Sequence, residues 1–289
     1  MTKPNPGRNG VWYAADKLKP NEWVRFLQQV ESLGYDALWH SESRHYEAMS
    51  FGAFALSNTS KLTIGTSIAN IYARDAISSA SAAATLNEFS DGRYILGLGV
   101  SHIPLVEKLR GHEYRKPVTS MRRYLTQMRT ANDDANQWPV TIAALGPKML
   151  ELSAEMTQGA LPYNVTPEHT AKAASILSPD QWLVVEQKFC LENDATKART
   201  LARAELARYM ALPNYVNNWR RLGFTDDDFA NGGSDRFMDA MVVWGDENTI
   251  RERVREHFDA GATHVCIQPV HETGDIDAAI NMLKVMAPS

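Results

Sequence analysis

Short apolar runs alternate with longer segments of helical spacing along almost the whole chain. The runs are rich in β-branched and aromatic residues, and apolar residues recur at every third and fourth position in the segments that follow them. This alternation predicts repeated β–α units around a parallel sheet. Strands are expected over residues 10–13, 36–41, 62–68, 94–100, 140–145, 159–163, 182–190 and 264–269. Helices are expected between them, for instance over 21–33, 76–89, 117–130, 147–156 and 247–260.

Eight β–α units are the number that closes a (β/α)8 TIM barrel, which is the α/β fold we predict. An open doubly wound sheet of eight strands is the competing arrangement. The chain has 289 residues, 44% of them hydrophobic, which is enough for one large barrel or two smaller domains. No change of composition marks a domain boundary, so we expect a single domain over residues 1–289.

Residues 212–244 interrupt this rhythm. The segment LPNYVNNWRRLGFTDDDFANGGSDRFMDAMVVW is too long for an ordinary loop, and it carries aromatic residues, paired asparagines and a Gly-Gly turn. We interpret it as an insertion before the last strand. Loops that follow barrel strands surround the active site, so the insertion is expected near the barrel mouth, where it covers or walls the pocket. The alternative is a peripheral helical pair that does not contact substrate.

Composition and motif content make several classes of function unattractive. The net charge is −4 with both signs interspersed, which disfavours nucleic acid as a partner. No apolar stretch is long enough for a signal peptide or a membrane span, so a cytoplasmic protein is expected. Cys190 and Cys266 lie in apolar runs and are interpreted as reduced core thiols. Metal-dependent hydrolysis and serine chemistry rank low, because HExxH, GxSxG, CxxC and Walker motifs are absent from the sequence.

Ionisable residues gather after the second and fourth expected strands, where a barrel places catalytic groups. His40, Glu42 and His45 lie on or just beyond the second strand, and His102 follows the fourth. Because a histidine titrates near pH ~6.5, His102 is suited to moving a proton or stabilising a negatively charged cofactor ring. His102 is the best single candidate. The alternative for each histidine is a structural hydrogen bond without any part in catalysis.

Three weaker signals each have two interpretations. GLGVS at 97–101 lacks the full GxGxxG spacing of a dinucleotide loop, and a strand end where the backbone approaches a ligand explains it better. Arg74 and residues 186–188 are expected either to serve a ligand or wet pocket, or to form ion pairs at the barrel rim. Lys188 is also a weak Schiff-base candidate for lyase or aldolase chemistry.

Six segments resemble the luciferase-like flavin and coenzyme F420-dependent oxidoreductases, specifically their small F420-type branch. They read ESLGYDALWHSE at 31–42, KLTIGTSIANIYARD at 61–75, TLNEFSDGRYILGLGVS at 85–101, VTIAALGPKMLELSAEMTQGALPYNVTPEH at 140–169, LPNYVNNWRRLGF at 212–224 and GDENTIRERVREHFDAGATHVCIQPV at 245–270. Together they cover most of the chain. The resemblance implies a (β/α)8 barrel with an insertion, a deazaflavin or flavin at its mouth, and assembly as a homodimer.

The resemblance also implies which residues hold the cofactor ring. In this superfamily a bulge at the end of the third strand, often with a non-prolyl cis peptide, supports the ring of F420. Ser67 and Ile68 occupy that position. The segment GLGVSH matches the end of the fourth strand, which contributes phosphate and ring contacts and points to Val100, Ser101 and His102.

A phosphate position is implied by the segment ALGPKM. It places Leu145, Gly146 and Pro147 just before a helix N-terminus. Free backbone amides and the helix dipole favour an anion at such a terminus. The resemblance therefore implies an anionic cofactor whose phosphate lies at these three residues.

The sequence departs from the family at two positions. Related F420 enzymes often end the second strand with Ser, an acid and His, whereas this chain reads Ser41, Glu42 and Ser43. In addition, His102 lies where some relatives carry a glutamate. We therefore expect His102 or His45 to handle the proton in place of the missing imidazole, with Glu42 matching the acidic member.

The resulting hypothesis is hydride transfer between C5 of F420 and a small organic substrate, such as an activated alkene, imine, alcohol or carbonyl. His102 or Glu42 is expected to support proton transfer, and backbone amides at Ser101 and Gly146 are expected to hold phosphate. The first alternative is an FMN-dependent monooxygenase supplied with electrons by a partner reductase. The second is a barrel without redox activity that serves as a binding or structural subunit. Spacing and composition do not distinguish F420 from FMN.

Overall fold

Eight parallel strands close into a barrel in the computed structural model, which describes residues 3–42, 44–130 and 138–288. The strand order is β1, β2, β3, β5, β6, β7, β8, β10, and β10 pairs with both β8 and β1. The bounds are Asn9–Tyr13 (β1), Ala37–His40 (β2), Thr63–Thr66 (β3), Tyr94–Gly99 (β5), Val140–Ile142 (β6), Gly159–Ala160 (β7), Trp182–Cys190 (β8) and His264–Pro269 (β10). The predicted barrel is confirmed, and the open doubly wound sheet is excluded.

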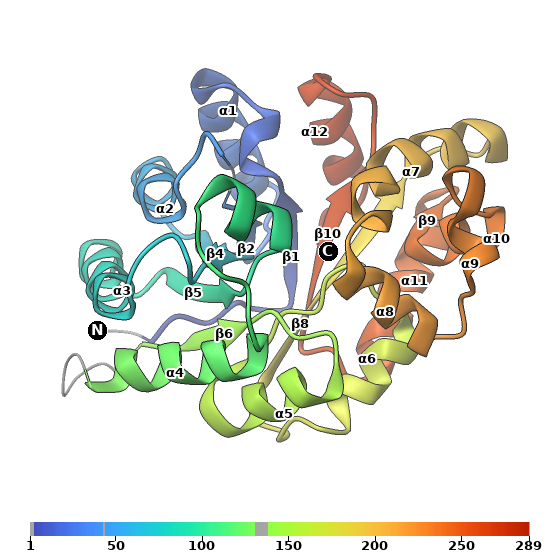
Figure 1. Ribbon diagram of the computed structural model, residues 1–289. Coiled ribbons are helices and arrows are strands. Elements are labelled where there is room, and N and C mark those ends of the chain that lie inside the picture. Colours follow the sequence, from blue (N-terminus) through green and yellow to red (C-terminus); the bar gives the residue numbers. More distant parts are fainter. Residues whose placement is uncertain (1–2, 43, 131–137, 289) are drawn as a thin grey trace.

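Helices cover the outside of this barrel (Figure 1). They are α1 (Pro20–Ser32), α2 (Ala48–Ser57), α3 (Ala76–Ser90), α4 (Pro117–Thr130), α5 (Pro147–Met156), α6 (Pro167–Ala174), α7 (Ala195–Met210), α11 (Glu247–Asp259) and α12 (Ile276–Val285), with short turns η1 (Ala15–Lys17) and η2 (Pro104–Leu109). The helices predicted over 21–33, 76–89, 117–130, 147–156 and 247–260 agree with α1, α3, α4, α5 and α11 to within one residue at each end. None of the described helices has the length and hydrophobicity needed to cross a bilayer.

Local sequence signals set many of the helix starts. Four helices begin after an aspartate whose side chain accepts a hydrogen bond from a first-turn amide, which satisfies a donor that has no partner within the helix. These aspartates are Asp75, Asp194, Asp246 and Asp275. Proline, whose fixed φ suits a first helical turn, begins α1, α5 and α6. The starts of these helices are therefore determined by residues close to them in the sequence.

The core has two layers, because successive side chains of a strand point to opposite faces. Outward-facing strand residues such as Leu38, Ile64 and Leu96 pack against the helices. Inward-facing residues fill the barrel, among them Trp39, whose indole nitrogen donates to Nε2 of His264 at 3.0 Å. This inner layer continues without a break into the aromatic residues of the insertion. The insertion is therefore packed on the barrel.

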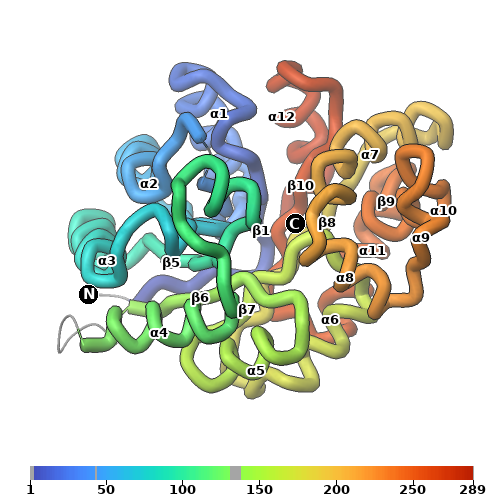
Figure 2. Tube along the Cα trace, viewed as in Figure 1, coloured from blue at the N-terminus to red at the C-terminus, as the bar shows by residue number. Residues whose placement is uncertain are grey.

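Residues 212–244 form α8 (Pro213–Arg221), α9 (Asp226–Phe229), η3 (Ala230–Gly232), α10 (Asp235–Met241) and β9 (Val242–Trp244). The chain trace groups α8, α9 and α10 beside α7 (Figure 2). β9 pairs with the end of β8, and β4 (Ala69–Asn70) pairs with β5. Neither short strand was predicted, because two or three residues are too few to show a strand period.

Candidate functional site

The bulge after β3, formed by Ser67 and Ile68, lies against the last residues of β5. The peptide bond between Ser67 and Ile68 is cis, as the family resemblance implies. A β-carbon on Gly97 would lie 1.9 Å from the carbonyl oxygen of Thr66, and one on Gly99 would lie 2.4 Å from Cγ1 of Ile68. The two glycines therefore make room for the neighbouring bulge, which corrects the expectation that their missing side chains admit a ligand.

Glu42 is held in an ion pair beside this bulge. Its carboxylate side chain is 6% exposed, pairs with the guanidinium of Arg74 and accepts a hydrogen bond from the backbone nitrogen of Asn70 at 2.7 Å. The backbone nitrogen of Glu42 donates to the carbonyl oxygen of Ile68 at 3.2 Å. Arg74 also pairs with Glu47 at 2.6 Å. These contacts tie the end of β2 to the bulge and occupy Arg74 in ion pairs.

His102 follows β5 and faces the insertion. Its Nδ1 lies 3.1 Å from Oδ1 of Asn214 in α8, and its ring centroid lies 5.6 Å from that of Tyr215. With Asn214 as the acceptor, Nδ1 carries the proton and Nε2 is left to accept one. Burial lowers the pKa of His102 from its ordinary value, against the opposing hydrogen bond to Asn214. The imidazole is therefore neutral at pH 7. Ser101, just before it, has a left-handed backbone with φ of 57°.

The N-terminus of α5 meets the insertion at Arg221. Gly146 is the N-cap and supplies no side-chain cap, and Pro147 is the first residue of the helix. A β-carbon on Gly146 would lie 3.6 Å from both terminal nitrogens of Arg221. Nε2 of His169 hydrogen-bonds the carbonyl oxygen of Leu145 at 2.8 Å, which holds the turn before the helix. An uncapped helix start beside a guanidinium favours an anion.

A cluster of buried tyrosines, Tyr163, Tyr209 and Tyr215, joins the barrel interior to the insertion. The hydroxyl of Tyr163 lies 2.8 Å from that of Tyr209 and donates to Gln268 at 2.9 Å. The ring centroids of Tyr209 and Tyr215 are 5.2 Å apart. Burial raises the pKa of Tyr163, so it stays a neutral phenol at physiological pH. Sequence analysis did not single out these tyrosines, because they come from three separate segments; the only signal was the aromatic content of the insertion.

Lys188 is enclosed by its own partners inside the barrel. Its Nζ lies 2.6 Å from Oδ1 of Asn164, 3.1 Å from Oε1 of Glu186 and 3.9 Å from the ring centroid of Tyr163. Burial lowers the pKa of Lys188 from its ordinary value. The ammonium is fully engaged, which argues against a Schiff-base role and fits the ion-pair interpretation of residues 186–188. Gln187 instead faces outward, where Oε1 accepts from Nε2 of His257 at 2.8 Å.

The structure separates two histidines at the end of the second strand, His40 and His45. His40 is fully buried and packs on the helical side of β2, with its ring centroid 4.5 Å from that of Phe51 in α2. His45 is exposed in the loop between β2 and α2. Ser43, the position of the missing family histidine, lies outside the described residues. Of the histidines singled out from sequence, His102 lies beside the insertion and His40 lies outside the barrel interior.

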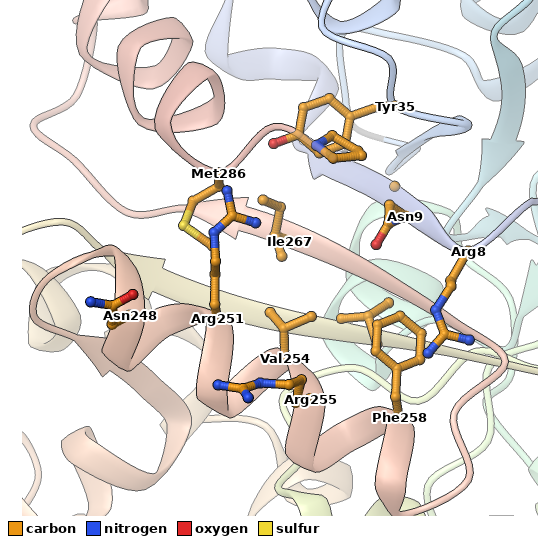
Figure 3. Close-up of a pocket in the computed structure, with 13 residues that line it drawn as sticks. Arg8, Asn9, Tyr35, Asn248, Arg251, Val254, Arg255, Phe258, Ile267 and Met286 are labelled. Carbon is orange, nitrogen blue, oxygen red and sulfur yellow. The ribbon is translucent and has the colours of Figure 1, made fainter.

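A separate cavity of about 340 Å³ lies at the other end of the barrel, by the starts of β1 and β10. Its lining includes Arg8, Arg251 and Phe258, and the close-up shows these side chains between β1, β10, α11 and the end of α12 (Figure 3). Chemistry in a barrel belongs to the opposite end, where the strands finish. We therefore place the candidate site at the strand ends, around the bulge, His102 and Gly146.

The amino-acid sequence matches a known family over most of its length. The family described as luciferase-like monooxygenase matches residues 5–264. The chain belongs to this family.

Solved and curated relatives of this luciferase-like protein match most of its length. It is 26% identical to 5,10-methylenetetrahydromethanopterin reductase of Methanolobus tindarius, over 84% of this chain and 88% of that protein. The coenzyme F420-dependent tetrahydromethanopterin reductase from Methanopyrus kandleri has a TM-score of 0.72 at 20% identity, covering 97% and 98% of the two chains. An F420-dependent secondary alcohol dehydrogenase, solved with an F420-acetone adduct, has a TM-score of 0.78 at 15% identity, covering 98% and 100%. These solved structures share the fold.

Proposed function

We propose that this luciferase-like protein is a coenzyme F420-dependent oxidoreductase that transfers a hydride between the deazaflavin and a small organic substrate. The observation that carries the proposal is family membership over residues 5–264, with both solved relatives described above being F420-dependent enzymes. The same relatives act on a pterin and on a secondary alcohol. We therefore favour a substrate that offers an imine, alcohol, carbonyl or activated alkene.

The residues at the strand ends fit a planar cofactor that carries an anionic side chain. Ser67, Ile68 and Val100 offer backbone and, at Ile68 and Val100, apolar side chains for the ring. Ser101 and the turn at Leu145 and Gly146 offer backbone amides for the phosphate, and Pro147, which has no N–H, begins α5. The structural support is that α5 starts without a side-chain cap beside the guanidinium of Arg221, which is the electrostatic setting that a phosphate requires.

When bound, F420 supplies the hydride chemistry at C5. Nε2 of His102 takes a proton from the substrate, or returns it in the reverse direction, while Asn214 holds Nδ1 and fixes the ring. Glu42 acts through Arg74 and Asn70 to hold the bulge under the ring, so in our proposal it is a positioning residue. His45 is the second choice for handling the proton.

The organisation of the protein around this site is also proposed. We treat residues 1–289 as one domain in which the segment 212–244 walls the barrel mouth. Support comes from the hydrogen bond between His102 and Asn214, and from the inner core that continues into the insertion. Location in the cytoplasm and assembly as a homodimer remain predictions from the sequence.

The first experiment is a titration of the purified protein with F420 and, separately, with FMN, followed by fluorescence quenching at moderate ionic strength. Saturable and selective binding of F420 is the expected result. It would be followed by a substrate screen that records the absorbance of the oxidised cofactor. Preference for FMN would overturn the proposal in favour of a monooxygenase, and binding of neither would favour a barrel without redox activity.

A further inference from the structure

One face of α8 carries three polar residues that share a spacing. Asn214, Asn218 and Arg221 are four and then three positions apart, so they lie on one side of the helix. The first contacts His102 after β5, and the last lies beside Gly146 at the start of α5. From the helical rise, the two ends of this face are about 10 Å apart. The polar face of α8 thus runs from the end of β5 to the start of α5.

Asn218 lies between these two contacts and is buried, with 1% of its surface exposed. Its Nδ2 has no hydrogen-bond partner among the described residues. A buried amide without a partner is unfavourable, and native proteins rarely tolerate one unless a ligand or water completes it. Asn218 therefore lies on the helix between the residue that contacts His102 and the residue beside Gly146.

The two neighbouring arginines of α8 differ in their partners. Arg220 pairs with Asp226 at 2.6 Å on the exposed side of the helix. Arg221 has no ion-pair partner within the described ranges, and it is near enough to lower the pKa of His169 by its charge. Burial is the larger cause of that lowering. An unpaired guanidinium thus stands over the uncapped start of α5, where the helix dipole adds to its attraction for an anion.

We infer that the polar face of α8 is the half of the phosphate site that the insertion supplies, with Arg221 and Nδ2 of Asn218 donating to the cofactor phosphate opposite the start of α5. The inference rests on the proposed function for the cofactor class and deepens it. Arg221 pairs with the charge of the phosphate, and Asn218 donates a further hydrogen bond to the phosphate. At the other end of the same helix, Asn214 orients the imidazole of His102. One element therefore links cofactor binding to the group that handles the proton.

The test compares three deazaflavins that differ in their anionic parts: F420, the deazaflavin 5′-phosphate, and phosphate-free 8-hydroxy-5-deazariboflavin. Dissociation constants are measured by fluorescence quenching for the wild-type protein, Arg221→Gln, Asn218→Leu and the matched control Arg220→Gln. Loss of one charge-assisted contact should weaken binding of both phosphorylated ligands about tenfold in Arg221→Gln, and severalfold in Asn218→Leu. Binding of the phosphate-free ligand should not change, and Arg220→Gln should match the wild type for all three.

A salt series gives a second readout. Affinity of the wild type for F420 should fall as potassium chloride is raised, and Arg221→Gln should show a shallower dependence because one of the screened charges is gone. Equal weakening of all three ligands would mean that Arg221 only holds α8 in place, which would overturn the inference. If Arg221→Gln weakens the binding of F420 alone, Arg221 pairs with the carboxylates beyond the phosphate, and this result would also overturn the inference.

Failure of the proposed cofactor class gives a different result. If the wild-type protein binds none of the deazaflavins but binds FMN, the proposed function is wrong. The role of Arg221 is then tested by comparing how much Arg221→Gln weakens the binding of FMN, which has a phosphate, and of riboflavin, which has none. Equal effects of Arg221→Gln on FMN and riboflavin would then refute the inference. Binding of none of these probes would refute both proposals.

Discussion

At the scale of single residues, the surroundings of a side chain decide its role more than its type does. His40 ends a barrel strand and His102 follows one, yet His40 packs against Phe51 on the helical side and His102 faces α8. Glu42 follows the end of β2 and Glu186 lies in the middle of β8, yet both carboxylates are engaged by a buried cation. Both ring nitrogens of His40 lack a hydrogen-bond partner among the described residues, but they are buried on the helical side of β2. Of these four groups, His102 is the one that offers a nitrogen beside the insertion.

Replacing His102 with Ala should lower kcat by about a hundredfold, because general acid–base catalysis contributes at least that much. The unfolding free energy should change by less than about 1 kcal/mol, since the side chain is half-buried and makes one described hydrogen bond. Steady-state kinetics and urea denaturation measure the two effects. Unchanged turnover would remove His102 from the mechanism.

The pH dependence of the wild type adds a check on the same residue. Because the pKa of His102 is lowered, its neutral form persists below pH ~6.5, the ordinary value. In the direction in which His102 accepts a proton, kcat should stay constant above that pH and fall only in more acidic solution. A kcat that already decreases at pH values above 7 as the solution is made more acidic would contradict a neutral His102.

Replacing Glu42 with Gln separates positioning from proton transfer. Glutamine keeps an oxygen for the amide of Asn70 but removes the charge that pairs with Arg74, so the unfolding free energy should fall by about 3 kcal/mol. F420 should bind less tightly because the bulge loses its support. Full stability with abolished turnover would instead assign Glu42 to the proton transfer, and Glu47→Gln at the exposed partner is the matched control.

At the scale of elements, the site is built where β3, β5, α5 and α8 meet. The bulge after β3 depends on the absence of side chains in β5, and the N-terminus of α5 has the guanidinium of Arg221 from α8 beside it. The hydrogen bonds that join Thr66 and Gly97, at 2.8 and 2.9 Å, fix the two strands at this point. The geometry of the mouth is therefore a property of pairs of elements.

Gly97→Ala should unfold or severely destabilise the protein, by more than about 3 kcal/mol, because its β-carbon would meet the backbone of Thr66 at 1.9 Å. The control is Gly34→Ala, which meets no atom within 4 Å and has only the cost of its φ of 82°, about 1 kcal/mol. Thermal denaturation of the two variants measures the difference. Equal melting temperatures would show that β3 and β5 adjust easily.

At the scale of the whole molecule, buried neutral histidines make the fold sensitive to acid. Burial lowers the pKa of His40 and His264 to about 4 and that of His257 to about 3. His264 accepts from the indole nitrogen of Trp39 at 3.0 Å and lies 3.1 Å from the carbonyl oxygen of Gly7, an arrangement that needs the neutral ring. The folded state therefore binds fewer protons than the unfolded chain in mild acid.

The unfolding free energy should be constant above pH ~6.5 and fall as the pH drops towards 4. The reason is that the unfolded chain binds protons at histidines that stay neutral in the folded state. A pKa of about 4 in place of 6.5 corresponds to about 3 kcal/mol for His264 at the low end of this range. Urea denaturation at pH 7 and pH 4.5 measures the loss. His264→Gln keeps a donor and an acceptor without titrating, so its loss should be smaller; an identical pH dependence would exclude His264 as a cause.

The sequence by itself determined the β–α rhythm, and with it the barrel, the bounds of α4 and α5, and the residues that follow each strand. These features are local, because strand and helix periods, prolines and capping aspartates act within a few residues of the chain. The tertiary structure decided which of those residues meet. Arg221 lies beside Gly146, Lys188 donates to Glu186 and Asn164, and β9 pairs with β8. These contacts come from packing between segments that no local period relates.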